Sequence, residues 1–329
     1  MKSVLHNNYE YLISIDNLLL AYQEFIKGKR NKKDVQEFSF RLMDNIILLH
    51  EDLQNNTYKH GDYQQFSIND PKPRTIHKAS VRDRLLHHAV YHILYPFFDK
   101  TFISDSFSCR NNKGTHKALS QFKKYGYIVS KNNTKICWVL KCDIKKFFAS
   151  IDQQTLISIL EQYILDENIV NLLKEIIFSF KPNGLPLGNL TSQLFSNVYL
   201  NEFDQFVKHR LKVKYYIRYA DDFVILSENR NNLEKIIPEI KEFLQDKLKL
   251  QIHPNKIYIK TLSSGVDFLG WVNFADHRVL RNKTKKRMMQ RIKKNPSIET
   301  LNSYLGLMEH GNTQKIKAKI NIDKYIKLE

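Results

Sequence analysis

Two adjacent aspartates between apolar runs constrain the fold of this chain more than any other feature. Asp221 and Asp222 separate the runs 215–219 and 223–226, which are rich in Tyr, Ile, Val, Leu and Phe. Such runs on both sides of a short polar break are typical of a β-hairpin with the carboxylates at its tip. Neighbouring carboxylates repel each other, so a fold that holds them together must raise a pKa or supply a cation. The pattern predicts a hairpin that carries a divalent-metal site, with a solvated turn as the alternative.

A third carboxylate, Asp143, follows a run that favours a buried strand. Residues 136–142 are mostly apolar, and Asp143 stands where that strand is expected to end. Three carboxylates on a strand end and a hairpin tip form the pattern of a two-metal phosphoryl-transfer site. In such a site, paired cations activate an attacking hydroxyl and stabilise the leaving oxygen.

Composition indicates the class of partner. The 329 residues include 52 Lys and Arg against 34 Asp and Glu, which gives a net charge of +18. This excess predicts a polyanionic partner, nucleic acid ahead of a membrane surface. No apolar stretch is long enough for a transmembrane helix, and the N-terminus lacks the pattern of a secretory signal, so a cytoplasmic location is expected. The odd number of cysteines, 3, favours reduced thiols.

The periodicities predict an α+β fold. Helical spacing is found over 9–27 and 34–54, and Asp34 is a suitable N-cap for the second helix. A short strand is expected over 63–68, and residues 69–76 are expected to form a turn followed by another strand. A helix from Ser80 is expected to stop before Pro96. Further along, the pattern spells β-α-β-β-α-β, the ferredoxin-like plan, with these elements: strand 136–142, helix 190–209, strands 213–219 and 223–227, helix 231–248 and strand 256–260. In this plan Asp143 and Asp221 come together from adjacent strands.

These motifs resemble those of one enzyme family. Residues 219–222, Tyr-Ala-Asp-Asp, resemble the active-site box of reverse transcriptases, and Asp143 with Phe148 resembles their first catalytic motif. The resemblance spans roughly residues 60 to 315. It implies a polymerase right hand with the following parts: an N-terminal helical segment (1–60), fingers (61–135), a ferredoxin-like palm (136–262, with a helical insertion at 152–182), primer-grip strands (263–280) and a short, basic helical thumb (281–329).

The resemblance also implies a role for each matching residue. Two Mg²⁺ ions, with Mn²⁺ as a substitute, would bind Asp143, Asp221 and the Ile144 carbonyl, with Asp222 as an outer partner. The incoming deoxynucleotide would contact six residues: Lys72, Arg74, Phe148, Leu187, Gly188 and Lys256. Template RNA and the RNA/cDNA duplex would contact six others: Arg110, Lys113, Gln193, Lys283, Lys286 and Arg287. The aromatic ring of Phe148 leaves no room for a ribose 2′-hydroxyl, while its neighbour Phe147 is expected in the core.

One segment points to a branch of the family. Residues 187–193, Leu-Gly-Asn-Leu-Thr-Ser-Gln, resemble the pattern of diversity-generating retroelements, where most reverse transcriptases carry Gln-Gly at 187–188. This branch copies a template-repeat RNA with errors at adenines for mutagenic retrohoming, together with a small, basic, oligomeric accessory protein. Replacing an amide by Leu187 removes a hydrogen-bonding group beside the nascent pair, which loosens base discrimination. The alternatives are a retron or abortive-infection type of defence reverse transcriptase, and a non-catalytic RNA-binding scaffold that retains the palm.

Overall fold

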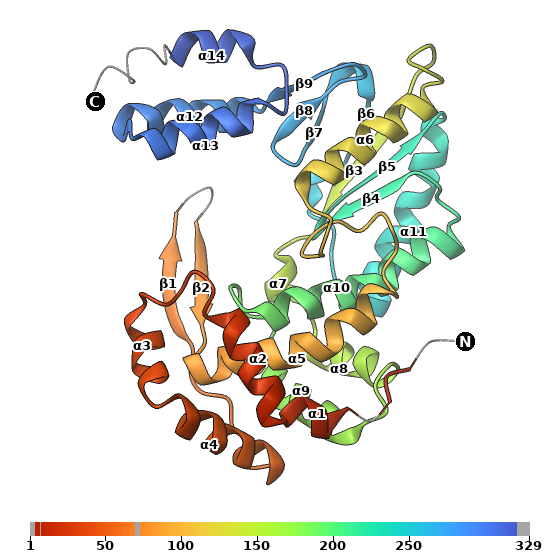
Figure 1. The fold of residues 1–329 in the computed structure, drawn as a ribbon. Helices are drawn as coiled ribbons and strands as arrows, with labels where there is room; N and C mark the ends of the chain where they lie inside the picture. The colour runs from red at the N-terminus through yellow and green to blue at the C-terminus, as the bar shows by residue number, and fades with distance from the viewer. Residues whose placement is uncertain (1–3, 7, 70–72, 321–329) are drawn as a thin grey trace.

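The computed structural model describes residues 4–6, 8–69 and 73–320, and Figure 1 shows the arrangement of their helices and strands. These described residues form helices and three separate sheets, of two, four and three strands. The hairpin β1–β2 and the basic C-terminal helices stand opposite each other at one end of the molecule, while the four-stranded sheet lies to one side of both (Figure 1). No described helix is long and apolar enough to cross a membrane.

The N-terminal segment forms four helices rather than two. They are α1 (Tyr9–Ile13), α2 (Ile15–Phe25), α3 (Lys33–Phe40) and α4 (Leu42–Gln54). Ser14 interrupts the first predicted helix because its side chain accepts a hydrogen bond from the N–H of Asn17 and caps α2. The prediction that Asp34 is an N-cap is wrong, because Lys32 is the capping residue. Asp34 lies in the first turn, where its carboxylate binds Lys78 at 2.7 Å and Arg84 at 2.5 Å.

The next segment carries the antiparallel hairpin β1 (Gln64–Ile68) and β2 (Arg74–Lys78), followed by the helices α5 (Val81–Asp99) and α6 (Thr115–Val129). Ser80 caps α5 as predicted, since its side chain accepts from the N–H of Asp83. The expected stop before Pro96 is wrong, because α5 continues to Asp99. Burial of Phe98, whose ring packs edge-on against Tyr163 at 5.6 Å, helps to hold the last turn despite the missing proline N–H.

The central sheet confirms the ferredoxin-like plan. Its strands β3 (Trp138–Asp143), β4 (Tyr216–Tyr219), β5 (Asp222–Ser227) and β6 (Tyr258–Thr261) are ordered β4-β5-β3-β6, with antiparallel pairing throughout. The crossing helices are α10 (Leu190–Gln205), extended by the π-helical turn η1 (Phe206–Arg210), and α11 (Arg230–Leu248). Three shorter helices, α7 (Phe147–Ser150), α8 (Gln153–Glu161) and α9 (Glu167–Phe178), follow β3.

Side-chain alternation gives this sheet two different faces. Leu140 and Cys142 of β3 enter the core that contains the buried sides of α10 and α11. Val139 enters a second core with residues of α6 and of the small C-terminal sheet. Lys141 and Asp143 share the face of Val139 because they lie two and four positions further along the strand. The carboxylate of Asp143 therefore points away from α10 and α11.

The C-terminal part begins with three strands, in the segment where the sequence predicted the primer-grip strands. They are β7 (Val266–Phe268), β8 (Trp271–Asn273) and β9 (Arg278–Leu280), and the helices α12 (Asn282–Lys294), α13 (Ile298–Met308) and α14 (Gln314–Ile320) follow. The third strand is only three residues long, and its pairing with β8 is not visible in the local apolar pattern.

Candidate active site

The three predicted carboxylates converge at one end of the central sheet. Asp143, the last residue of β3, lies directly opposite Asp222, the first residue of β5. Asp221 shares with Ala220 the two-residue turn between β4 and β5, and its carbonyl accepts a hydrogen bond from the N–H of Ile144 at 3.2 Å. The hairpin is confirmed, but only Asp221 lies at its tip, because Asp222 already pairs within the sheet.

Burial and the charges of neighbouring carboxylates raise the pKa of two of these aspartates, Asp221 and Asp222. The pKa of Asp221 is raised to about 6, first by burial and then by the charges of Asp222 and Asp143. Burial also raises the pKa of Asp222, against the opposing effect of the Lys141 ammonium. A cation bound between Asp221 and Asp222 would offset the repulsion between their negative charges.

Two lysines contact the cluster. The Nζ of Lys141 lies 2.7 Å from Asp222 Oδ1, and the Nζ of Lys256 lies 2.7 Å from Asp143 Oδ1. The Lys141 side chain is only 9% exposed, whereas that of Lys256 is 42% exposed. No role for Lys141 was predicted from the sequence, although a lysine inside a buried strand, two positions before Asp143 and on the same face, was a usable signal.

The chemistry of the donor set fits a divalent ion. All its members are carboxylates or a backbone carbonyl, the oxygen ligands that Mg²⁺ prefers. In the described part of the chain, no three His, Cys, Asp or Glu side chains are grouped as a ready-made ion cage. Instead, Lys256 and Lys141 hold two of the three carboxylates. An ion that binds Asp143 through Oδ1 would replace the Lys256 ammonium.

The loop 181–189 is hydrogen-bonded to the segment after β3 and to the hairpin β1–β2. The N–H of Leu185 donates to the Phe148 carbonyl at 2.8 Å, and the Leu187 carbonyl accepts from the N–H of His77 at 2.9 Å. The Asn189 side chain donates to the His77 carbonyl at 3.1 Å. Phe147 is buried, as predicted, while the ring of Phe148 is half-buried. The loop thus brings Leu187 and Phe148 into one connected framework.

Gly184 has the closest backbone approach in this loop. Its φ is +84°, and a Cβ there would lie 2.6 Å from the Phe148 carbonyl oxygen and 2.8 Å from the Ala149 Cα. We expect Gly184→Ala to lower the free energy of unfolding by about 2 to 4 kcal/mol, through left-handed strain plus steric overlap. Urea denaturation measures the change. Gly270→Ala is the matched control, because φ is +87° with no atom within 4 Å, and it should cost only about 1 kcal/mol. Equal losses in the two variants would contradict the tight fit around Phe148.

The remaining predicted nucleotide contacts lie in the hairpin and beside the loop. Arg74 is the first residue of β2 and is exposed, while Lys72 lies outside the described residues. Gly188 is exposed at a φ of +110°, and a Cβ there would lie 2.8 Å from Ile76 Cγ2. Gln193 and Gly188 line a cavity of about 390 Å³ together with residues of α2, α5 and the hairpin. The role of each residue stays a prediction.

The predicted nucleic-acid contacts differ in their surroundings. The Arg110 side chain is 6% exposed and donates to Asp99 Oδ1 at 2.7 Å and to the Ile103 carbonyl at 2.7 Å, an arrangement that supports a structural role. Lys113 donates to the Ser104 carbonyl at 2.8 Å. On α12, Lys283 and Lys286 are exposed and Arg287 is half-buried. This helix has seven basic residues and no acidic one, opposite a buried side formed by Met288 and Ile292.

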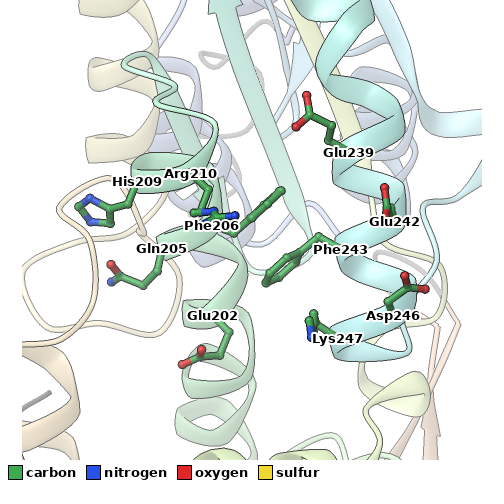
Figure 2. A pocket seen from close by; sticks show the side chains of 10 residues that line it. All are labelled: Glu202, Gln205, Phe206, His209, Arg210, Glu239, Glu242, Phe243, Asp246 and Lys247. Carbon is green, nitrogen blue, oxygen red and sulfur yellow. The ribbon is translucent and has the colours of Figure 1, made fainter.

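A cavity of about 630 Å³ lies on the other side of the central sheet, between α10 with η1 and α11. Figure 2 shows the rings of Phe206 and Phe243 between the two helices; they stack at 4.2 Å. Four acidic side chains line it: Glu202, Glu239, Glu242 and Asp246. None of the three clustered aspartates does, so this cavity is separate from the candidate active site.

Comparisons with known proteins show which family the chain belongs to. The family model for "Reverse transcriptase (RNA-dependent DNA polymerase)" matches residues 59–272. Protein YkfC of Escherichia coli (strain K12) is 24% identical over an alignment of 288 residues, covering 74% of this chain and 74% of that protein. The group II intron-encoded protein LtrA of Lactococcus lactis subsp. cremoris is 26% identical over an alignment of 377 residues, covering 89% of this chain and 60% of LtrA.

Among solved structures, the fold is similar to apo telomerase from Candida tropicalis truncated from its C-terminal domain. The TM-score is 0.51 at 11% identity, over 70% of this chain and 59% of that one. This likeness shows a polymerase right-hand fold. Because the family model covers well over half of the sequence and includes all three aspartates, the chain belongs to the reverse transcriptase family of RNA-directed DNA polymerases.

Proposed function

We propose that this chain copies an RNA template into cDNA at the cluster formed by Asp143, Asp221 and Asp222. The observation that supports this function best is the convergence of the three carboxylates on one sheet edge, where burial and repulsion raise the pKa of Asp221 to about 6. A purely structural cluster would gain nothing from such repulsion. Bound divalent ions would offset this repulsion between the three carboxylates.

In this proposal, Asp143, Asp221 and the Ile144 carbonyl hold Mg²⁺ or Mn²⁺. When bound, the ions would supply Lewis-acid activation of the primer hydroxyl and neutralise the leaving pyrophosphate. Lys141 stays with Asp222 because its ammonium is buried against that carboxylate, which makes Asp222 an outer partner rather than a main ligand. Lys256 leaves Asp143 and gives a proton to pyrophosphate, since its side chain is exposed enough to move.

The residues that would contact the nucleotide and the template are proposed from their positions in the fold and in the sequence motifs. Arg74, with Lys72, would bind the triphosphate from the hairpin, since the guanidinium fork matches phosphate oxygens. Phe148 would lie under the sugar and exclude a 2′-hydroxyl. The basic surface of α12, with Lys283, Lys286 and Arg287, would hold the phosphates of the RNA/cDNA duplex. The division into fingers, palm, primer-grip strands and thumb follows the predicted boundaries.

We further propose that the chain is the reverse transcriptase of a diversity-generating retroelement. The support is the segment 187–193, whose first residue is hydrogen-bonded to β2 and lies in the same framework as Phe148. In this role it would copy a template-repeat RNA with errors at adenines and work with a small basic accessory protein.

Leu187→Gln should reduce misincorporation. A side-chain amide beside the nascent pair would restore a hydrogen bond of about 1 kcal/mol, which corresponds to roughly fivefold better base discrimination. The error rate at each template base is measured by sequencing cDNA made on an RNA template that contains the four bases in equal proportion. Leu187→Met is the control, because it keeps the volume without an amide and should leave the error rate unchanged. A rise in errors with glutamine would contradict the proposed role of Leu187.

Primer extension on RNA with Mg²⁺ and deoxynucleotides tests the whole proposal. We expect cDNA whose errors concentrate at template adenines, and no product from Asp221→Asn. Accurate copying at adenines would favour the defence type of reverse transcriptase. RNA binding without extension, equal in wild type and Asp221→Asn, would leave only the non-catalytic scaffold.

A further inference from the structure

Arg218 is a fully buried cation next to the catalytic turn. It lies in β4, three positions before Asp221, and its side chain is 0% exposed. Burial of an unpaired guanidinium costs several kcal/mol. Nearly all N–H donors of this guanidinium are therefore expected to have hydrogen-bond acceptors. The predictions from sequence gave this residue no role.

The guanidinium joins the turn to two other elements. It binds Asp204 of α10 through two parallel hydrogen bonds, Nε to Oδ1 at 2.8 Å and Nη2 to Oδ2 at 2.6 Å. It also donates to Asn197 Oδ1 of α10 at 3.2 Å and to Ser106 Oγ, in the segment before α6, at 3.0 Å. The remaining contact is from Nη1 to the Ala220 carbonyl at 3.3 Å.

The contact with Ala220 reaches the peptide that carries Asp221. Ala220 has a φ of +52°, in the left-handed region that a residue with a Cβ adopts only at a cost of about 1 kcal/mol or more. Its carbonyl belongs to the peptide bond with Asp221, so holding that oxygen fixes the plane from which the Asp221 side chain projects. The backbone of residue 218 is itself held, because its N–H donates to the Asp105 carbonyl at 2.9 Å and its carbonyl accepts from Phe107 N–H at 3.0 Å.

We propose that Arg218 is a positioning residue, which fixes the Ala220 peptide and thereby sets Asp221 for binding the divalent ion. The inference rests on the proposed metal-binding role of Asp221. Asp204 and Asn197 anchor the guanidinium on α10, and Ser106 anchors it on the segment before α6. The buried ion pair therefore stabilises the geometry of the turn as well as the core.

Tyr216 provides the matched control. It lies on the same strand, is equally buried, and donates its hydroxyl to the same Asp204 oxygen at 2.7 Å. No hydrogen bond joins its side chain to the described residues of the turn. Tyr216→Phe should therefore weaken the Asp204 network without releasing the Ala220 peptide.

The test compares Arg218→Lys, Arg218→Met and Tyr216→Phe in the full chain. Binding of Mn²⁺ is measured by electron paramagnetic resonance without nucleotide or primer, and the Mg²⁺ dependence of primer extension is measured below the unfolding temperature. Lysine keeps a charge but has one nitrogen in place of the three through which Arg218 contacts Asp204 and the Ala220 carbonyl. This variant therefore remains informative if methionine does not fold. We expect Arg218→Lys to weaken Mn²⁺ binding and raise the half-saturating Mg²⁺ concentration at least about tenfold. Tyr216→Phe should change neither.

Equal Mn²⁺ affinities for Arg218→Lys, Tyr216→Phe and wild type would overturn the inference and reduce Arg218 to a core ion pair. A wild-type chain that binds Mn²⁺ more tightly than Arg218→Lys but extends no primer would support the inference and overturn the proposed polymerase activity. The two failures are therefore distinguishable, because ion binding is read without turnover.

Discussion

Asp221→Asn should abolish primer extension while making the metal-free protein more stable. Loss of this carboxylate would remove a ligand of the ions that activate the primer hydroxyl and neutralise the leaving pyrophosphate. We therefore expect the extension rate to fall at least roughly a thousandfold. The asparagine has the same shape and no charge, so it relieves the repulsion among Asp143, Asp221 and Asp222. Rate is measured by single-nucleotide extension and stability by urea denaturation in a chelator.

The sign of the stability change follows from the pKa of Asp221. This pKa is raised to about 6 in the folded protein from an ordinary value of 3.8, so the folded state binds the proton more tightly. The metal-free wild type therefore loses stability as pH rises from about 4 to 6, and the loss persists above that range. At pH 7.5 the part due to Asp221 is about 2 to 3 kcal/mol, which Asp221→Asn should recover. Mg²⁺ should stabilise wild type but not the variant.

Asp246→Asn is the control for this experiment. Asp246 lies on α11 at the acidic cavity on the far side of the sheet, so its loss should change neither the rate nor the response to Mg²⁺. An Asp221→Asn protein that still extends primers, or that is less stable than wild type in chelator at pH 7.5, would contradict the assigned site.

Phe148→Ala should let ribonucleotides enter. Removal of the half-buried ring opens space for a 2′-hydroxyl, and relief of an overlap of about 3 kcal/mol corresponds to roughly a hundredfold loss of preference for deoxynucleotides. Competition between deoxynucleotide and ribonucleotide in extension on RNA measures the ratio of kcat/KM values.

The neighbouring ring separates selectivity from folding. Phe147 is buried in the core, and Phe147→Leu should lower the free energy of unfolding by about 1 kcal/mol or more without altering sugar selectivity. If Phe148→Ala only destabilised the protein and kept the deoxynucleotide preference, Phe148 would be a packing residue.

The central four-stranded sheet was predictable because the sequence patterns that indicate its elements are local and agree with each other. Strand periodicity, a polar break of two residues and the order β-α-β-β-α-β led to the sheet that places Asp143 opposite Asp222. The alternation of apolar and polar residues was sufficient to predict the register of β3. A shift of one residue would have buried the side chains of Lys141 and Asp143 in the core beside α10 and α11. Their polarity therefore fixed the register.

Features that depend on distant partners were not predictable. Helix α5 continues past Pro96 to Asp99, where Phe98 packs against Tyr163, which lies 65 positions further along the chain. Arg218 finds Asp204 from a helix 14 positions earlier in the chain. In each case the deciding contact joins segments whose proximity is known only once the chain is folded.

The hydrogen bonds between β2 and the loop after α9 have a mechanical consequence. His77 gives its N–H to Leu187 and receives the Asn189 amide on its carbonyl, so the residue is tied to the loop on both sides of its backbone. If the hairpin closes over a nucleotide, it must pull Leu187 with it or break both bonds. Movement of the hairpin toward the nucleotide and movement of Leu187 relative to the new base pair would then be coupled through His77.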